Sequence, residues 1–139
     1  MIEHYSEFFA TLKPDFKDKE FNDVFAPNAL FEDPFQKVYG TEAIITVFRH
    51  MYATLYAPKF IILESMGNHK SGYIRWKFLY SRSPDSPQEC IKGLSHVLFD
   101  DKGLVLSHID YWDAAANVYE KIPLLGWILR LLKNKIKAL

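Results

Sequence analysis

From Lys59 to Asp113 apolar and polar residues alternate, and this pattern most limits what the chain can fold into. A strand sends successive side chains to opposite faces. The period of two therefore predicts strands over 60–66, 73–81, 90–99 and 104–113. Turn sequences separate them at 67–72, 83–87 and 100–103. Consecutive strands joined by short turns predict a four-strand antiparallel meander.

The first half of the chain has the spacing of helices instead. Apolar residues three and four positions apart predict helices over 2–13, 17–25 and 41–55, with a brief extended segment over 29–33. Helices followed by a meander favour an α+β fold with the helices on one face of the sheet. A chain of 139 residues is expected to form one domain.

Residues 121–139 differ from the rest of the chain in charge. They carry five cations and no acid, whereas residues 1–120 carry 12 bases and 17 acids. Pro123 begins a predicted helix over 123–139 with a broad arc of leucine and isoleucine on one side. We interpret this helix in one of two ways. It packs on the core or on a dimer mate, or it is a surface helix that touches anionic lipid.

Composition excludes several classes of protein. The formal net charge is zero, so nothing favours binding to nucleic acid. A single cysteine, Cys90, rules out an internal disulfide, and no Cys/His spacing indicates a zinc site. The N-terminus has no pattern of a signal peptide, and no stretch approaches the ~20 apolar residues of a membrane span. We expect a cytoplasmic protein without metal or cofactor.

The last predicted strand carries the side chains best suited to chemistry. Alternation places five residues on one face: Leu104, Leu106, His108, Asp110 and Trp112. The imidazole, carboxylate and indole then follow each other at intervals of about 7 Å. In an apolar cavity wall, His108 and Asp110 would form an acid–base pair. On a packed or solvated face they would be a structural hydrogen-bonded pair.

The order of elements and two short motifs resemble a known superfamily. Glu32-Asp33-Pro34 ends the extended segment, and Gly40-Thr41-Glu42-Ala43-Ile44 opens the next helix. Up to about residue 115 the chain resembles the nuclear transport factor 2-like superfamily, which includes ketosteroid isomerases and SnoaL-type polyketide cyclases. The resemblance implies a cone-shaped domain over 1–120, with a curved antiparallel sheet around a deep pocket. The amphipathic helix predicted within 121–139 is then an addition to this cone, in the same domain. It also implies a homodimer through the outer sheet face.

The resemblance transfers some catalytic positions and not others. Asp33 falls on the position of the isomerase general base, and His108 and Asp110 fall on pocket-lining positions. The oxyanion donors do not transfer, because the helix tyrosine falls at or near Phe8 and the strand aspartate becomes Ser95. Losing one such donor typically costs roughly 3 kcal/mol in the transition state. We therefore do not expect steroid isomerisation by that mechanism.

We expect a small hydrophobic molecule to bind in an apolar pocket. The catalytic candidates are Asp33, His108 and Asp110, and the substrate-binding candidates are Phe35, Trp76, Ser95 and Trp112. Asp33 is either a general base or a turn carboxylate. The two tryptophans are either a clamp for a flat ligand or core rings.

Two hypotheses about function follow. The first is cofactor-free acid–base catalysis of the isomerase or cyclase type. The second is a non-enzymatic ligand-binding module whose basic C-terminal helix contacts a protein or the surface of a membrane.

Overall fold

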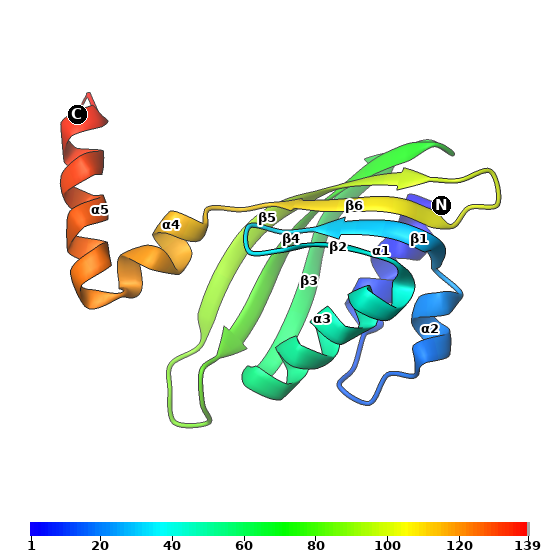
Figure 1. Cartoon of the computed structure of the whole chain (residues 1–139), viewed down its shortest axis with the longest axis horizontal. Coiled ribbons are helices and arrows are strands. Elements are labelled where there is room, and N and C mark those ends of the chain that lie inside the picture. Colours follow the sequence, from blue (N-terminus) through cyan, green and yellow to red (C-terminus); the bar gives the residue numbers. More distant parts are fainter. Residues whose placement is uncertain (139) are drawn as a thin grey trace.

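Six strands form one curved sheet in the computed structural model, which describes residues 1–138 of the chain (Figure 1). The strands are β1 (Phe25–Glu32), β2 (Lys37–Tyr39), β3 (Tyr56–Gly67), β4 (Ser71–Ser81), β5 (Glu89–Phe99) and β6 (Val105–Tyr111). Their order across the sheet is β2-β1-β6-β5-β4-β3. The predicted meander is confirmed as β3 to β6, in which each strand pairs antiparallel with the next.

The sheet contains two pairings that the sequence did not predict. β1 lies parallel to β6, with Phe31 opposite His108, and β2 pairs antiparallel with the other edge of β1. The sheet is therefore mixed rather than wholly antiparallel, within the α+β class that was predicted. The extended segment over 29–33 is the end of β1, and no local pattern indicates a partner so far away in the chain.

Helices α1 (Ile2–Thr11), α2 (Asp18–Asn22) and α3 (Thr41–Thr54) lie on the concave side of this sheet (Figure 1). They match the predicted helices, except that the second ends early because Phe25 begins β1. After β6 follow a short helix α4 (Ala114–Asn117), a 3₁₀ turn η1 (Tyr119–Lys121) and α5 (Pro123–Ile136). The Asp113 carboxylate caps α4 by accepting the N–H of Ala116 at 2.9 Å.

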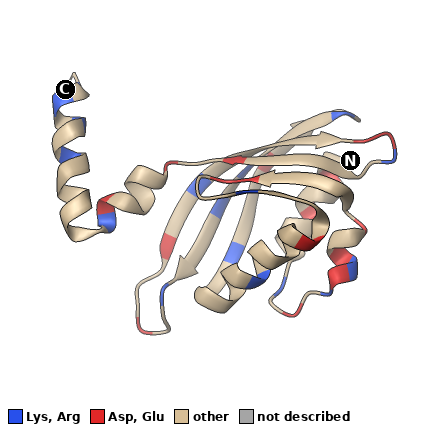
Figure 2. Cartoon of the chain, viewed as in Figure 1, with Lys and Arg blue, Asp and Glu red and all other residues tan. Residues whose placement is uncertain are grey.

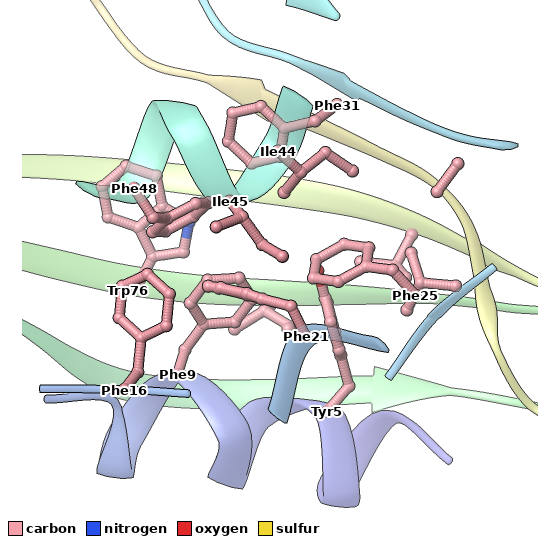
Figure 3. Close-up of a cluster of buried hydrophobic side chains, with 14 of the residues drawn as sticks. Tyr5, Phe9, Phe16, Phe21, Phe25, Phe31, Ile44, Ile45, Phe48 and Trp76 are labelled. Carbon is pink, nitrogen blue, oxygen red and sulfur yellow. The ribbon is translucent and has the colours of Figure 1, made fainter. Parts of the chain in front are cut away.

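Aromatic rings fill the space between the helices and the sheet (Figure 3). Tyr5 of α1 packs edge-on against Phe9 and Phe25, and Phe21 contacts Phe25 and Phe48. Rings set edge to face gain attraction beyond the area they bury. This cluster holds α1, α2 and α3 on the sheet.

A β-bulge in β6 places Leu106 on a different face of the sheet from the one predicted. Leu98 lies opposite Ser107 and Phe99 lies opposite Val105, so Leu106 is the extra residue. Val105 is 1% exposed and Leu106 is 39% exposed. The prediction that Leu106 shares the face of His108 is therefore wrong, because one inserted residue reverses the alternation.

The outer face of the sheet is partly apolar and partly cationic. Tyr73, Leu94, Leu98 and Tyr111 are exposed there. Lys59, Arg75, Lys77 and Lys92 project from the same face, since each pairs with a residue of that face in the strand register. The homodimer expected through this face stays a prediction.

Helix α5 stands apart from the sheet (Figure 1) and packs against η1. The interpretation in which it covers the chain's own core is therefore wrong, while a dimer mate and a lipid surface stay open. The predicted helix over 123–139 ends at Ile136, and Leu139 lies outside the described residues. Within residues 1–138, no helix is both long enough and apolar enough to cross a bilayer.

Candidate functional site

A cavity of about 570 Å³ lies between the inner face of the sheet and α3. Small-molecule sites in proteins commonly span roughly 300–1,000 Å³. Most of its wall is apolar and comes from Phe9, Phe31, Val47, Phe48, Met51, Leu55, Phe60, Ile62, Ile74, Phe78 and Ile91. Its polar lining is therefore sparse, and the acidic and basic groups in it stand out.

His108 is held on β6 by contacts on three sides. Its ring is 3% exposed and stacks on Phe31, with ring centroids 4.9 Å apart. Nδ1 lies 2.7 Å from the hydroxyl of Tyr5, and Nε2 lies 2.7 Å from Oδ1 of Asp110. The two residues share a strand face at positions i and i+2, which lets their side chains meet.

Asp110 receives a second hydrogen bond from the neighbouring strand. The hydroxyl of Ser95 donates to Oδ1 of Asp110 at 2.5 Å, and the indole Nε1 of Trp76 donates to Oγ of Ser95 at 2.8 Å. An indole N–H can only donate, so Ser95 accepts it and keeps its own proton for Asp110. Two strands, β4 and β5, therefore help to fix this carboxylate.

These contacts form one continuous row from Tyr5 to Trp76. With a single proton on Nε2, His108 donates to Asp110 and accepts from Tyr5 at Nδ1. This tautomer gives every group in the row a partner, as buried polar groups require. Asp110 lies at the centre of the row and is the shared acceptor for donors on both sides.

Tyr5 is suited to be the donor at the end of this row. Burial raises the pKa of its hydroxyl well above the ordinary value, and the nearby charge of Asp110 raises it further. The hydroxyl therefore stays protonated and donates to His108. The apolar spacing of the predicted helix over 2–13 did not indicate this contact. A fully buried tyrosine needs a partner for its hydroxyl, but only the fold identifies that partner.

Asp33 lies where the cavity meets the turn between β1 and β2. Oδ1 accepts the backbone N–H groups of Phe35 at 2.8 Å and Gln36 at 3.0 Å. Oδ2 accepts the side-chain amide of Gln36 at 3.0 Å. The carboxylate makes the contacts of a turn residue. Its role as a general base stays a prediction.

The predicted aromatic residues line different parts of the cavity wall. Trp76 is buried in the core, with its indole fixed by Ser95. Phe35 and Trp112 meet edge to face with ring centroids 5.3 Å apart, and Phe35 and Tyr119 do so at 6.2 Å. Both tryptophans line the cavity, and their role as a clamp for a flat ligand stays a prediction.

A cationic group at the cavity wall was also missed from the sequence. Glu89 accepts hydrogen bonds from Lys121 at 2.5 Å and from Arg82 at 3.0 Å, and both cations line the cavity. Burial would raise the pKa of Glu89, but the bonds and charges of Lys121 and Arg82 outweigh it and lower the pKa. Among residues 1–138, no cluster of three His, Cys, Asp or Glu side chains is placed to hold a metal ion.

The sequence matches a known family over most of its length. Residues 2–108 match the family model of the SnoaL-like domain. The chain belongs to the SnoaL-like domain family. This confirms the resemblance to the nuclear transport factor 2-like superfamily. No curated protein matches this SnoaL-like domain in sequence.

Solved structures share the fold at low identity. A candidate SnoaL-like polyketide cyclase from Jannaschia sp. CCS1 is 12% identical, with a TM-score of 0.70 over 82% of this chain and 85% of that one. A protein with a ketosteroid isomerase-like fold from Catenulispora acidiphila DSM 44928, in complex with trimethylamine, is 12% identical. Its TM-score is 0.74 over 91% of this chain and 98% of that one. At such identities, the likeness shows only that this SnoaL-like domain has the same fold as these proteins.

Proposed function

We propose that this SnoaL-like domain binds a small, largely apolar carbonyl compound and transfers a proton on it without a cofactor. The observation that carries the proposal is the placement of Asp110, a carboxylate in a mostly apolar cavity wall with one oxygen fixed by two donors. A positioned base in such surroundings is the basic requirement for enolisation. The family and the candidate cyclase among its structural relatives support the same class of reaction.

The two oxygens of Asp110 have different surroundings. Oδ1 accepts from Ser95 and His108, whereas Oδ2 has no hydrogen bond to any group within residues 1–138. Oδ2 would take a proton from the carbon beside the carbonyl, and the C–H electron pair would form an enolate. Return of this proton from Oδ2 to another carbon gives isomerisation. Attack of the enolate carbon on a second carbonyl forms the ring, the electron pair of that C=O moves to its oxygen, and the proton on Oδ2 is then returned to this oxygen.

His108 would act as a positioning residue for this base. It donates to Oδ1 of Asp110 and is itself held by Tyr5 and Phe31. A carboxylate fixed from both sides loses little freedom when the substrate binds, which lowers the entropic part of the barrier. Side chains in the wall that could donate to the substrate oxygen include His50, Thr54 and Arg82.

A test can use 2-tetralone, an apolar bicyclic ketone with acidic C–H bonds beside its carbonyl. Proton NMR in D₂O measures how fast these hydrogens exchange in the presence of the protein. We expect Asp110→Asn to slow the catalysed exchange about 10²–10⁴-fold, the usual contribution of a general base.

Asp33→Asn is the matched control, because an amide oxygen can still accept the two backbone N–H groups of that turn. If Asp110 is the base, this variant retains most of the catalysed exchange. The opposite result, with Asp33→Asn inactive and Asp110→Asn active, would assign the base to Asp33.

The alternative is a module that binds such a molecule without turnover, favoured by an exposed C-terminal helix that suits an interaction partner. It predicts that 2-tetralone changes the fluorescence of Trp76 and Trp112 on binding. It also predicts that the wild-type protein exchanges its hydrogens no faster than buffer does.

A further inference from the structure

Helix α5 is held to the rest of the chain by its polar side. The guanidinium of Arg130 donates to the backbone carbonyl of Glu120 at 3.0 Å, and Lys133 forms an ion pair with the Glu120 carboxylate at 3.0 Å. Gly126 lies against the same carbonyl, so close that a Cβ there would come within 1.9 Å of the oxygen. These positions are three or four apart and therefore share one side of the helix.

The opposite side of α5 is apolar and has no cover within the described residues. Its exposed side chains are Leu124, Trp127, Ile128, Leu131, Leu132 and Ile136, with Leu124 70% and Ile136 83% exposed. An amphipathic helix normally turns its apolar side to the core of its own domain. Here the contacts with Glu120 leave that side exposed, and α5 stands apart from the sheet (Figure 1).

The charge of α5 limits what can cover this surface. Lys and Arg are the charged residues along the helix, and residues 121–138 contain no acid (Figure 2). Lys135 lies four residues after Leu131 and three after Leu132, so it is on the apolar side, near the C-terminal end of the helix. Its long side chain can carry the cation from there to the headgroups. Tryptophan, leucine and flanking lysines are the usual composition of helices that lie in the interface of an anionic membrane.

A second copy of this chain offers no complementary surface of this kind. Two α5 helices packed through their apolar sides would place Lys135 of each copy inside that contact. The outer sheet face, the other exposed apolar surface, carries Lys59, Arg75, Lys77 and Lys92. Its paired acid is Glu64, which bonds to Arg75 at 3.0 Å. Like charges therefore oppose both arrangements.

We infer that α5 binds the surface of an anionic lipid bilayer, with its apolar side in the interface and the cation of Lys135 against headgroup phosphates. The segment before α5 lines the cavity through Val118, Lys121 and Ile122. Bound in this way, the chain would hold that end of the cavity near the lipid, and an apolar ligand could pass between them. The passage of an apolar ligand rests on the proposed function, whereas the lipid binding does not.

The test is flotation of the full-length protein with vesicles of phosphatidylcholine and phosphatidylglycerol in equal parts, and with vesicles of phosphatidylcholine alone. We expect the protein to float with the anionic vesicles and to be released by added salt. The fluorescence of Trp127 should shift to shorter wavelength on binding, and Trp127→Phe should remove the shift. Failure of the wild-type protein to float with the anionic vesicles would overturn the inference.

Two variants separate the apolar and the electrostatic parts. Ile128→Glu places a charge on the apolar side and should weaken vesicle binding at least about tenfold. Lys135→Gln removes one cation and should weaken it about fivefold. Both side chains are exposed, so the fold should be unaffected, which thermal melting by circular dichroism checks.

Matched controls lie at the exposed end of β3 and in the turn between β5 and β6. Met66→Glu adds an acid at an exposed apolar side chain, and Lys102→Gln removes an exposed cation. Neither should change vesicle binding.

Vesicle binding by Ile128→Glu equal to that of the wild-type chain would contradict the inference. So would a wild-type dimer that this substitution converts to a monomer while neither form binds vesicles. The exchange assay with 2-tetralone contains no lipid, so it tests the proposed proton transfer independently of vesicle binding.

Discussion

The hydroxyl of Tyr5 lies 2.7 Å from Nδ1 of His108, although 103 positions separate the two residues in the chain. The contact joins α1 to β6 through the centre of the aromatic core. It fixes the imidazole so that Nε2 faces Asp110. The first helix therefore determines the orientation of a group on the last strand.

Removing that hydroxyl should cost stability. In Tyr5→Phe the buried Nδ1 of His108 loses its donor, and an unpaired buried polar group costs about 1–3 kcal/mol. Urea unfolding measures the loss. Tyr111→Phe removes an exposed hydroxyl and should change the free energy of unfolding by less than about 0.5 kcal/mol. Equal stability of Tyr5→Phe and the wild-type protein would show that the contact contributes nothing.

Gly93 leaves room for the indole of Trp76. A Cβ at this position would lie 2.3 Å from two carbons of that ring. Gly93→Ala should therefore displace the ring, break its bond to Ser95 and destabilise the protein by about 1–3 kcal/mol. Tryptophan fluorescence and urea unfolding report both effects. Lys92→Ala, at the adjacent exposed position, should leave both nearly unchanged; a stable Gly93→Ala with wild-type fluorescence would contradict the prediction.

The ion pairs of Glu89 should make stability depend on pH in acid. Lys121 and Arg82 lower the pKa of Glu89 below its ordinary value of 4.5, although burial acts in the other direction. A carboxylate with a lowered pKa in the folded state stabilises the protein above pH 4.5, and this contribution is lost as pH falls further. The wild-type protein should thus exceed Glu89→Gln in stability near neutrality, with the gap closing in acid. Urea titrations at successively lower pH measure the difference in free energy of unfolding between the two proteins. A difference that stays constant as the pH falls would refute the prediction.

Gly126 permits the close contact between α5 and η1. Gly126→Ala should open this contact, because the added Cβ would lie 1.9 Å from the Glu120 carbonyl oxygen. The helix itself should persist, since alanine favours a helix over glycine by about 1 kcal/mol. Spin labels on the exposed Cys90 and on Asn134→Cys would show a broader distance distribution in this variant. Leu124→Ala is the control, and an unchanged distribution in Gly126→Ala would rule out the proposed effect.

Local patterns predicted the parts of the fold that depend on neighbours in the chain. Strands β3 to β6 follow from alternation and short turns, and the proximity of His108 to Asp110 follows from their positions i and i+2 on one strand. The placement of Leu106 did not follow, because a bulge depends on the register with β5. The bond from Trp76 to Ser95 also needed the strand register.

The sequence by itself determined the α+β class, the meander, the SnoaL-like resemblance and the amphipathic, cationic character of the C-terminal helix. Periodicity and composition are properties of the chain that need no partner. Only the tertiary structure decided that β1 runs parallel to β6, that Tyr5 holds His108, and that α5 turns its apolar side outward. Each of these depends on which distant groups meet, and a one-dimensional pattern does not contain that information.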